Sequence, residues 1–140
     1  MAEAVIFIGL PGSGKTTYFE AHFSATHAHI SRDLSSSQRE EEQKAAECLA
    51  GSRSFVVDDT NVTRAVRSKW IAAAKRAGFR TIAYVFDTPV RIAIGRNNHR
   101  QDKKPIPVPA ILKMSKQMER PSADEGFDEI HGVAMPSAPP

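Results

Sequence analysis

The chain has 140 residues, a length that suits one domain rather than two. Hydrophobic residues make up 41% of it and charged residues 25%, a balance that excludes collagen-like, disordered and membrane-embedded proteins. The net charge is only +3, but residues 61–120 carry 14 Lys and Arg against 3 Asp and Glu, which favours either a surface that attracts polyanions or well-solvated helix faces.

The apolar segments predict strands that alternate with helices. Residues 4–8 form a continuous apolar run, as in a strand buried on both faces. Further strands are expected at residues 28–31, 55–57, 81–86 and 127–133. Helices are expected at residues 16–23, 38–50, 63–77, 89–97 and, after a connector with Pro105, Pro107 and Pro109, at 110–118. The alternation predicts an α/β domain over residues 1–134, with a parallel sheet of about five strands flanked by helices, and a flexible Pro-rich tail over residues 135–140.

The strongest local motif directly follows the first expected strand. Residues 9–16 fit the pattern G-x-x-x-x-G-K-[ST] and open a helix. In such loops the glycines let backbone N–H groups converge on phosphate oxygens, Lys15 reaches the β and γ phosphates, and the hydroxyl of Thr16 holds Mg²⁺. The motif predicts a site for a nucleoside triphosphate and Mg²⁺. The expected nucleotide-binding residues here are Gly9, Gly12, Ser13, Gly14, Lys15, Thr16 and Thr17.

Carboxylates follow two other expected strands, at the edge of a parallel sheet where ligands collect. Asp33 could accept a proton from an attacking hydroxyl, although a helix N-cap or turn aspartate is the alternative. Asp58 and Asp59 end the next strand, and because adjacent strand residues point to opposite faces we expect only one of them to face the site. Asp58 is the candidate Mg²⁺ ligand. Asp59 is the candidate on the acceptor side, with Thr60 and Asn61 turning beside it.

Arg96 and Arg100 lie one helical turn apart at the end of an expected helix, before a basic loop. Arginines on a lid can close over a triphosphate and neutralise the charge that develops during phosphoryl transfer. The alternative is that both are solvated arginines interacting with the helix dipole. We expect both to be catalytic and Arg96 also to bind the nucleotide.

In order and spacing, five motifs over residues 4–133 resemble the 5′-hydroxyl polynucleotide kinase family. They are the phosphate loop, Ser-Arg-Asp at 31–33, Val-Val-Asp-Asp-Thr-Asn at 56–61, Arg-Asn-Asn-His-Arg at 96–100 and the Val-Pro before the last helix. The resemblance implies a P-loop kinase fold with a basic lid, in which Lys15 and Thr16 bind ATP and Mg²⁺. It further implies that Asp33 activates the acceptor 5′-OH, that Arg96 and Arg100 are lid arginines, and that Asp59 lies beside the acceptor.

One position departs from the family. An arginine usually stands three residues after the base and contacts the acceptor's phosphate, but this chain has Ser36, with Arg32 or Arg39 as substitutes. The acidic run at residues 40–42 is also an unusual lining for a polynucleotide groove. We expect an ATP-dependent kinase that acts on the 5′-OH of DNA or RNA. A P-loop kinase of a small-molecule hydroxyl and a nucleotide-dependent switch or weak ATPase remain the alternatives.

The remaining features predict structure and location. His22, His27 and His29 lack the spacing and companions of a metal site, and Trp70 and Cys48 are expected in the core. No apolar run approaches the roughly 20 residues of a spanning helix, and the first residues lack the charge pattern of a secretory signal. We therefore expect a cytoplasmic protein with a nucleic-acid substrate, no membrane and no obligate protein partner.

Overall fold

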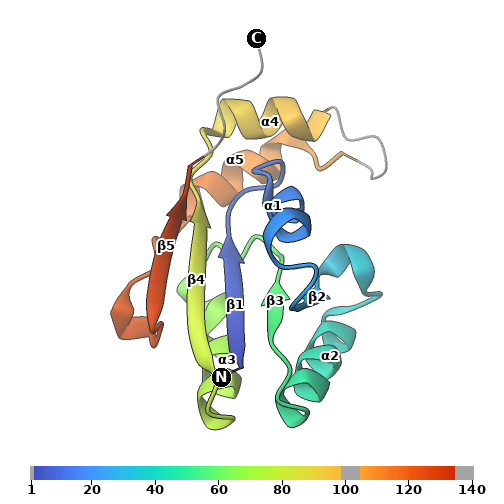
Figure 1. Cartoon of the computed structure of the whole chain (residues 1–140). Helices are drawn as coiled ribbons and strands as arrows, with labels where there is room; N and C mark the ends of the chain where they lie inside the picture. The colour runs from blue at the N-terminus through green and yellow to red at the C-terminus, as the bar shows by residue number, and fades with distance from the viewer. Residues whose placement is uncertain (1, 99–104, 135–140) are drawn as a thin grey trace.

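The computed structural model describes residues 2–98 and 105–134. Within them, five parallel strands form one sheet in the order β2-β3-β1-β4-β5 (Figure 1). The strands are β1 (Glu3–Ile8), β2 (Ala28–Ile30), β3 (Phe55–Val57), β4 (Arg80–Phe86) and β5 (Glu129–Val133). This arrangement confirms the predicted α/β class and the parallel sheet. The predicted tail, residues 135–140, lies outside the described residues.

Helices connect the strands and flank the sheet. The helices of the described chain are α1 (Lys15–His22), α2 (Gln38–Ala50), α3 (Arg64–Arg76), α4 (Val90–Asn98) and α5 (Val108–Gln117), with short 3₁₀ turns η1 (Arg32–Leu34) and η2 (Ala123–Glu125). The side chains of Ser37 and Thr63 accept hydrogen bonds from the backbone of the first turns of α2 and α3, which explains where these helices begin. Helix α5 begins two residues earlier than predicted, because Pro109 is tolerated in a first turn, where its missing N–H costs nothing.

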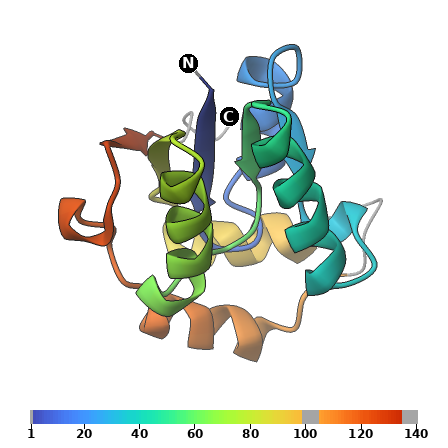
Figure 2. The ribbon, with the colours of Figure 1, turned by 90° about the horizontal axis from the view of Figure 1, so that it is seen from below.

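The core has two layers, one on each face of the sheet. Strand β1 lies in the middle and is buried on both faces. On one face Ile6 packs in a cluster with Cys48 of α2 and Trp70 of α3, and on the other Phe7 packs with Phe19 of α1. Figure 2 shows α2 and α3 together on one side of the sheet. The predicted burial of Cys48 and Trp70 is confirmed.

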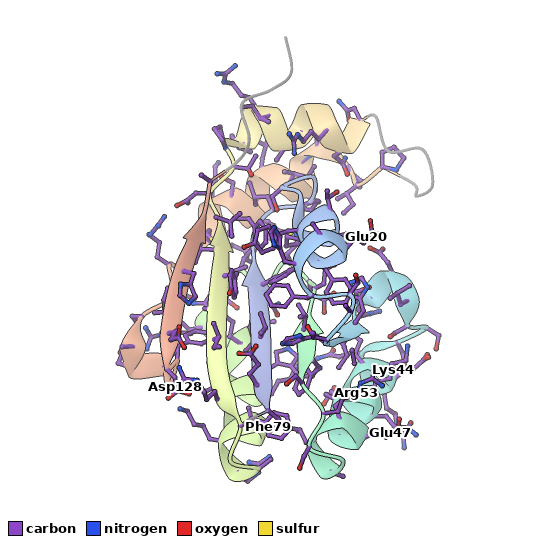
Figure 3. The ribbon with its side chains drawn as sticks, in the orientation of Figure 1. Glu20, Lys44, Glu47, Arg53, Phe79 and Asp128 are labelled. Atoms are coloured by element: carbon purple, nitrogen blue, oxygen red, sulfur yellow. The ribbon has the colours of Figure 1, made fainter. Side chains whose placement is uncertain are left out.

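Ion pairs link the basic middle of the chain to its acidic C-terminal segment. The pairs are Arg64–Asp124, Arg67–Glu125, Lys75–Asp128 and Arg80–Glu129. Figure 3 shows Asp128 beside the start of β5. Four of the basic side chains are thus paired within the fold. The positive charge that the surface offers to polyanions is therefore smaller than the charge of residues 61–120 suggests. In the part of the chain that the structure describes, no helix is both long and apolar enough to cross a membrane.

Candidate functional site

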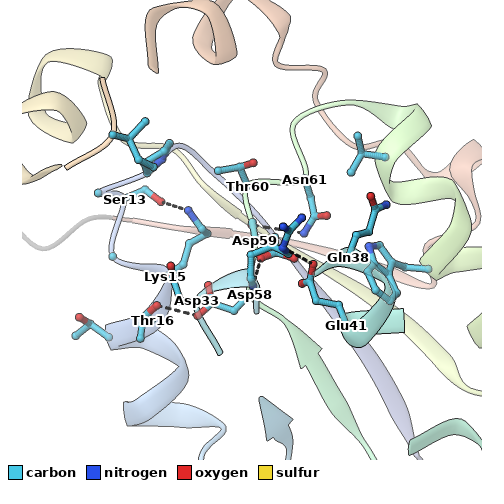
Figure 4. A pocket seen from close by; sticks show the side chains of 18 of the residues that line it. Ser13, Lys15, Thr16, Asp33, Gln38, Glu41, Asp58, Asp59, Thr60 and Asn61 are labelled. Atoms are coloured by element: carbon cyan, nitrogen blue, oxygen red, sulfur yellow. Dashed lines mark hydrogen bonds and ion pairs between the residues drawn. The ribbon is translucent and has the colours of Figure 1, made fainter. Parts of the chain in front are cut away.

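A cleft of about 760 Å³ lies at the edge of the sheet where the strands end. Because the strands are parallel, this edge brings together the loop after β1, turn η1 after β2 and the turn at residues 58–61 after β3. Figure 4 shows Lys15 and Thr16 on one side and Glu41 on the other, with Asp58 and Asp59 between them. We call these two parts the P-loop side and the α2 side of the cleft.

The P-loop, residues 9–16, curls around the ammonium group of Lys15. Gly12 and Gly14 have φ angles of +80° and +89°, which side-chain-bearing residues rarely adopt. A Cβ atom on Gly12 would lie 2.5 Å from the carbonyl oxygen of Ala93 in α4. The buried Lys15 Nζ donates to the carbonyl oxygen of Gly9 at 3.0 Å. The glycines therefore allow both the loop's curvature and its close packing on α4.

The structure brings the predicted nucleotide-binding residues together. Those that line the cleft are Gly12, Ser13, Gly14, Lys15, Thr16, Thr17 and Arg96. Gly9 lies under the loop instead, where a Cβ atom would come within 2.8 Å of Ser13 Oγ. Residues 99–104 of the predicted basic lid lie outside the described residues. They include Arg100, which we expect one helical turn after Arg96.

Asp58 joins the P-loop to β2 and β3. Its Oδ2 atom accepts a hydrogen bond from Thr16 Oγ1 at 2.9 Å and lies 2.8 Å from His29 Nε2. The His29 ring stacks on Phe19, with centroids 3.8 Å apart. Carboxylate and hydroxyl oxygens are the ligands that Mg²⁺ prefers, so Thr16 and Asp58 fit the expected metal. The sequence predicts no role for His29, because a single histidine on a short strand has no local pattern that reveals its partner.

Asp58 and Asp59 both line the cleft, so the prediction that only one would face it is wrong. Strand β3 ends at Val57, and the alternation of strand side chains no longer applies beyond it. Asp58 turns toward Thr16, whereas Asp59 Oδ1 accepts a hydrogen bond from the backbone N–H of Arg32 at 3.0 Å. The two carboxylates therefore serve different sides of the same cleft.

Hydrogen bonds hold the turn with Thr60 and Asn61 to the end of β1 and to the start of the P-loop. The carbonyl oxygen of Thr60 accepts a hydrogen bond from Gly9 N–H, and Asn61 Nδ2 donates to the carbonyl oxygen of Phe7 at 2.8 Å. Asn61 has a φ of +44°, which asparagine tolerates better than most residues. The fully buried Arg67 donates to the Asn61 carbonyl at 2.9 Å. Thr60 and Asn61 line the cleft as expected, but the sequence does not predict the buried arginine behind them.

Asp33 lies in η1 and lines the cleft with an exposed side chain. It is not a helix N-cap, because Ser31 precedes η1 and Ser37 precedes α2 in those positions. The structure therefore excludes the alternative that Asp33 is a helix N-cap. Two interpretations remain, a turn aspartate and a proton acceptor.

The α2 side of the cleft holds residues that the sequence does not single out. Glu41 has a relative exposure of only 2%, although it stands in an acidic run that is typical of a solvated helix face. Burial raises the pKa of Glu41 to about 8, and the neighbouring Asp59 carboxyl adds to the shift. Gln38 and Lys69 line the same side of the cleft. Only tertiary packing reveals these residues.

A family model described as AAA domain matches residues 5–121. The chain belongs to the AAA-domain family. This AAA domain is 26% identical over 144 residues to the bifunctional polynucleotide phosphatase/kinase of Schizosaccharomyces pombe, a match that covers 94% of this chain and 33% of the relative. The chain thus spans about a third of the length of this relative and of a second one, the putative bifunctional polynucleotide phosphatase/kinase of Acanthamoeba polyphaga mimivirus. The predicted resemblance to polynucleotide kinases is confirmed.

Solved structures share the fold. The crystal structure of Chaetomium thermophilum Kti12 in complex with ADP-AlF3 matches with a TM-score of 0.67 and 19% identity, over 94% of this chain and 88% of that chain. A gluconokinase from Sinorhizobium meliloti matches with a TM-score of 0.62 and 17% identity, over 98% and 84% of the two chains. This AAA domain therefore has the predicted P-loop kinase fold.

Proposed function

We propose that this AAA domain transfers the γ-phosphate of ATP to a hydroxyl group, and that the best-fitting acceptor is the 5′-OH of DNA or RNA. The observation that carries the proposal is one shared cleft: Asp33, a carboxylate able to accept a proton, lines it together with Lys15 of the P-loop. The order of the motifs and the name of the Schizosaccharomyces pombe relative support the 5′-OH acceptor.

The roles follow from the arrangement of the cleft. Lys15 and the backbone N–H groups of the P-loop would bind the triphosphate, and Thr16 and Asp58, which line the same cleft, would hold Mg²⁺. Bound Mg²⁺ supplies positive charge next to the phosphates. Asp33 accepts the proton of the acceptor hydroxyl as its oxygen bonds to the γ-phosphorus and ADP leaves. Arg96 and Arg100 neutralise the charge that develops on the transferred group.

The remaining predicted residues take part on the acceptor side. Asp59, Thr60 and Asn61 lie in the turn after β3, between the P-loop side and the α2 side of the cleft, and we assign them to acceptor binding. Their backbone and side-chain hydrogen bonds to β1, the P-loop and η1 keep this wall of the cleft in place. Such prior ordering lowers the cost of bringing the hydroxyl and the phosphate together.

A small-molecule hydroxyl is the second candidate acceptor. Ser36, which stands where the family has an arginine, does not line the cleft, and its hydroxyl bonds to the Glu40 carboxylate. Ion pairs within the fold also occupy part of the basic block that favours a polyanion. A nucleoside or a sugar has no phosphate, so its binding would need neither an arginine at position 36 nor a basic surface.

The test is transfer of label from γ-labelled ATP in the presence of Mg²⁺. The acceptors are DNA and RNA oligonucleotides with 5′-OH ends, nucleosides and gluconate, and Lys15→Ala is the inactive control. Label on the 5′ end of an oligonucleotide, absent with the control, supports the proposal. Transfer to a small acceptor alone supports the second candidate. Acceptor-independent phosphate release that Asp33→Asn leaves unchanged would instead indicate a nucleotide-dependent switch or weak ATPase.

A further inference from the structure

Arg32 is the arginine on the α2 side of the cleft. It stands next to Asp33 in η1, and its side chain is 56% exposed. Arg32 is one of the described residues that line the cleft, whereas Ser36 and Arg39 do not line it. Of the positions at which the sequence allows an acceptor-contacting arginine, the fold therefore brings one into the cleft.

Two carboxyl groups from different elements hold Arg32. Asp59, after β3, accepts a hydrogen bond from its backbone N–H at 3.0 Å. Glu41, in α2, places Oε1 3.6 Å from its Nε atom. Glu41 is itself buried, with its side chain 3% exposed. The Asp59 bond fixes the backbone of Arg32, and the Glu41 contact restricts its side chain. A restricted side chain loses less rotamer freedom when it binds a ligand, which favours recognition.

The outer end of Arg32 remains available to a ligand. In the part of the chain that the structure describes, its Nη atoms make no hydrogen bond to another residue, since the two anchors act on its backbone and on Nε. The raised pKa of Glu41 keeps much of that carboxyl protonated at neutral pH, so Glu41 does not fully cancel the charge of the guanidinium. Lys69, whose ammonium group pairs with Glu42 at 3.8 Å, also lines this side of the cleft.

We propose that Arg32, held by Glu41 and Asp59, binds a phosphate group of the acceptor and replaces the arginine that is missing at Ser36. This inference rests on the proposed kinase function. A planar guanidinium binds phosphate through paired hydrogen bonds, and in a 5′-OH polynucleotide the phosphate nearest to the hydroxyl is the 3′-phosphate of the terminal nucleotide. Adjacent residues would thus contact one nucleotide, Asp33 at the 5′-OH and Arg32 at the 3′-phosphate. The acceptor class is a nucleoside 3′-phosphate or a longer strand.

The experiment compares a nucleoside 3′-monophosphate with the matching nucleoside as acceptor. For the wild type, kcat/KM for the nucleotide should exceed that for the nucleoside by about 10- to 100-fold, the range expected for a hydrogen bond to a charged group. Arg32→Ala should bring this ratio close to one, chiefly through KM for the nucleotide, and Arg32→Lys should restore part of it. Arg32→Ala keeps the backbone N–H that Asp59 binds, so η1 should stay in place. Arg39→Ala is the matched control and should keep the wild-type ratio.

Glu41 variants test the anchor. Glu41→Gln retains a group that can accept a hydrogen bond from Arg32 and should keep most of the preference for the nucleotide. Glu41→Ala removes the anchor and should raise KM for the nucleotide more than KM for ATP. A purely structural role would instead lower the melting temperature and affect both substrates alike.

Binding measured by calorimetry separates failure of this inference from failure of the kinase proposal. Wild type should bind the nucleoside 3′-monophosphate more tightly than Arg32→Ala does, even without turnover. Equal affinities, an unchanged kcat/KM ratio in Arg32→Ala, or loss of the ratio in Arg39→Ala would each overturn the role of Arg32. Absence of transfer to every acceptor, with the nucleotide still bound through Arg32, would overturn the kinase proposal alone.

Discussion

Thr16 Oγ1 donates a hydrogen bond to Asp58 Oδ2 across 2.9 Å, and so joins the first turn of α1 to the end of β3. The two residues are 42 positions apart in the chain, and they meet because β1 and β3 are neighbouring parallel strands. His29, from β2 on the far side of β3, reaches the same carboxylate oxygen. Three elements therefore determine where this oxygen lies.

Asp58→Asn should raise the Mg²⁺ concentration that activity requires. The substitution removes the negative charge but keeps the size of the side chain, so we expect Mg²⁺ affinity to fall by about 10- to 100-fold, the range for residues that support a metal site. A titration of activity against Mg²⁺ measures this change. Thr16→Ser keeps the hydroxyl and is the matched control, whereas an unchanged Mg²⁺ requirement in Asp58→Asn would rule out the assignment.

Asp33→Asn should reduce kcat by about 10²-fold or more, the scale of general-base catalysis, and leave ATP affinity near the wild-type value. The reason is that Asp33 is exposed in η1, on a different element from the P-loop that binds the phosphates. Single-turnover transfer and nucleotide binding, measured side by side, separate the two effects. A parallel loss of ATP binding would make Asp33 a structural or metal-binding residue instead.

Glu41 should make stability depend on pH. Its pKa is about 8 in the fold, against an ordinary value of 4.5, so the folded state holds the proton more tightly than the unfolded state. The stabilising contribution of Glu41 to the free energy of unfolding is therefore fully present below pH 4.5 and is lost as the pH rises through about 8. Melting temperatures measured from pH 5 to pH 9 should fall more for the wild type than for Glu41→Gln, which has no proton to lose. Parallel curves would contradict the assignment.

Arg67→Ala should destabilise the protein strongly. Arg67 is fully buried, pairs with Glu125, whose side chain is 4% exposed, and donates to the carbonyl oxygen of Asn61. Removal of one partner leaves a buried charge without its counter-charge, which costs about 3–5 kcal/mol. Urea denaturation measures this loss. Arg64 lies in the same helix as Arg67, and Arg64→Ala breaks only its exposed ion pair with Asp124, so this control should change stability little. Similar losses of stability in both variants would refute the argument.

Much of the fold is predictable because its signals are local. The buried strand before Gly9, the helix that ends just before Gly51 and the glycines of the P-loop are each encoded by adjacent residues. The predicted start of α5 differs from the observed one by only two residues, because a proline is allowed in the first turn of a helix as well as before it. The family motifs also follow from short runs of sequence.

The sequence by itself determined the order of strands and helices, the P-loop and the positions of Asp33, Asp58 and Asp59 at strand ends. The tertiary structure decided that both Asp58 and Asp59 face the cleft, that His29 contacts Asp58, and that Glu41 is buried next to Arg32. These features depend on the packing of α2, η1 and β3 against one another. Burial and charge pairing between distant segments have no local pattern, because they arise only when the parallel strands bring their ends to one edge of the sheet.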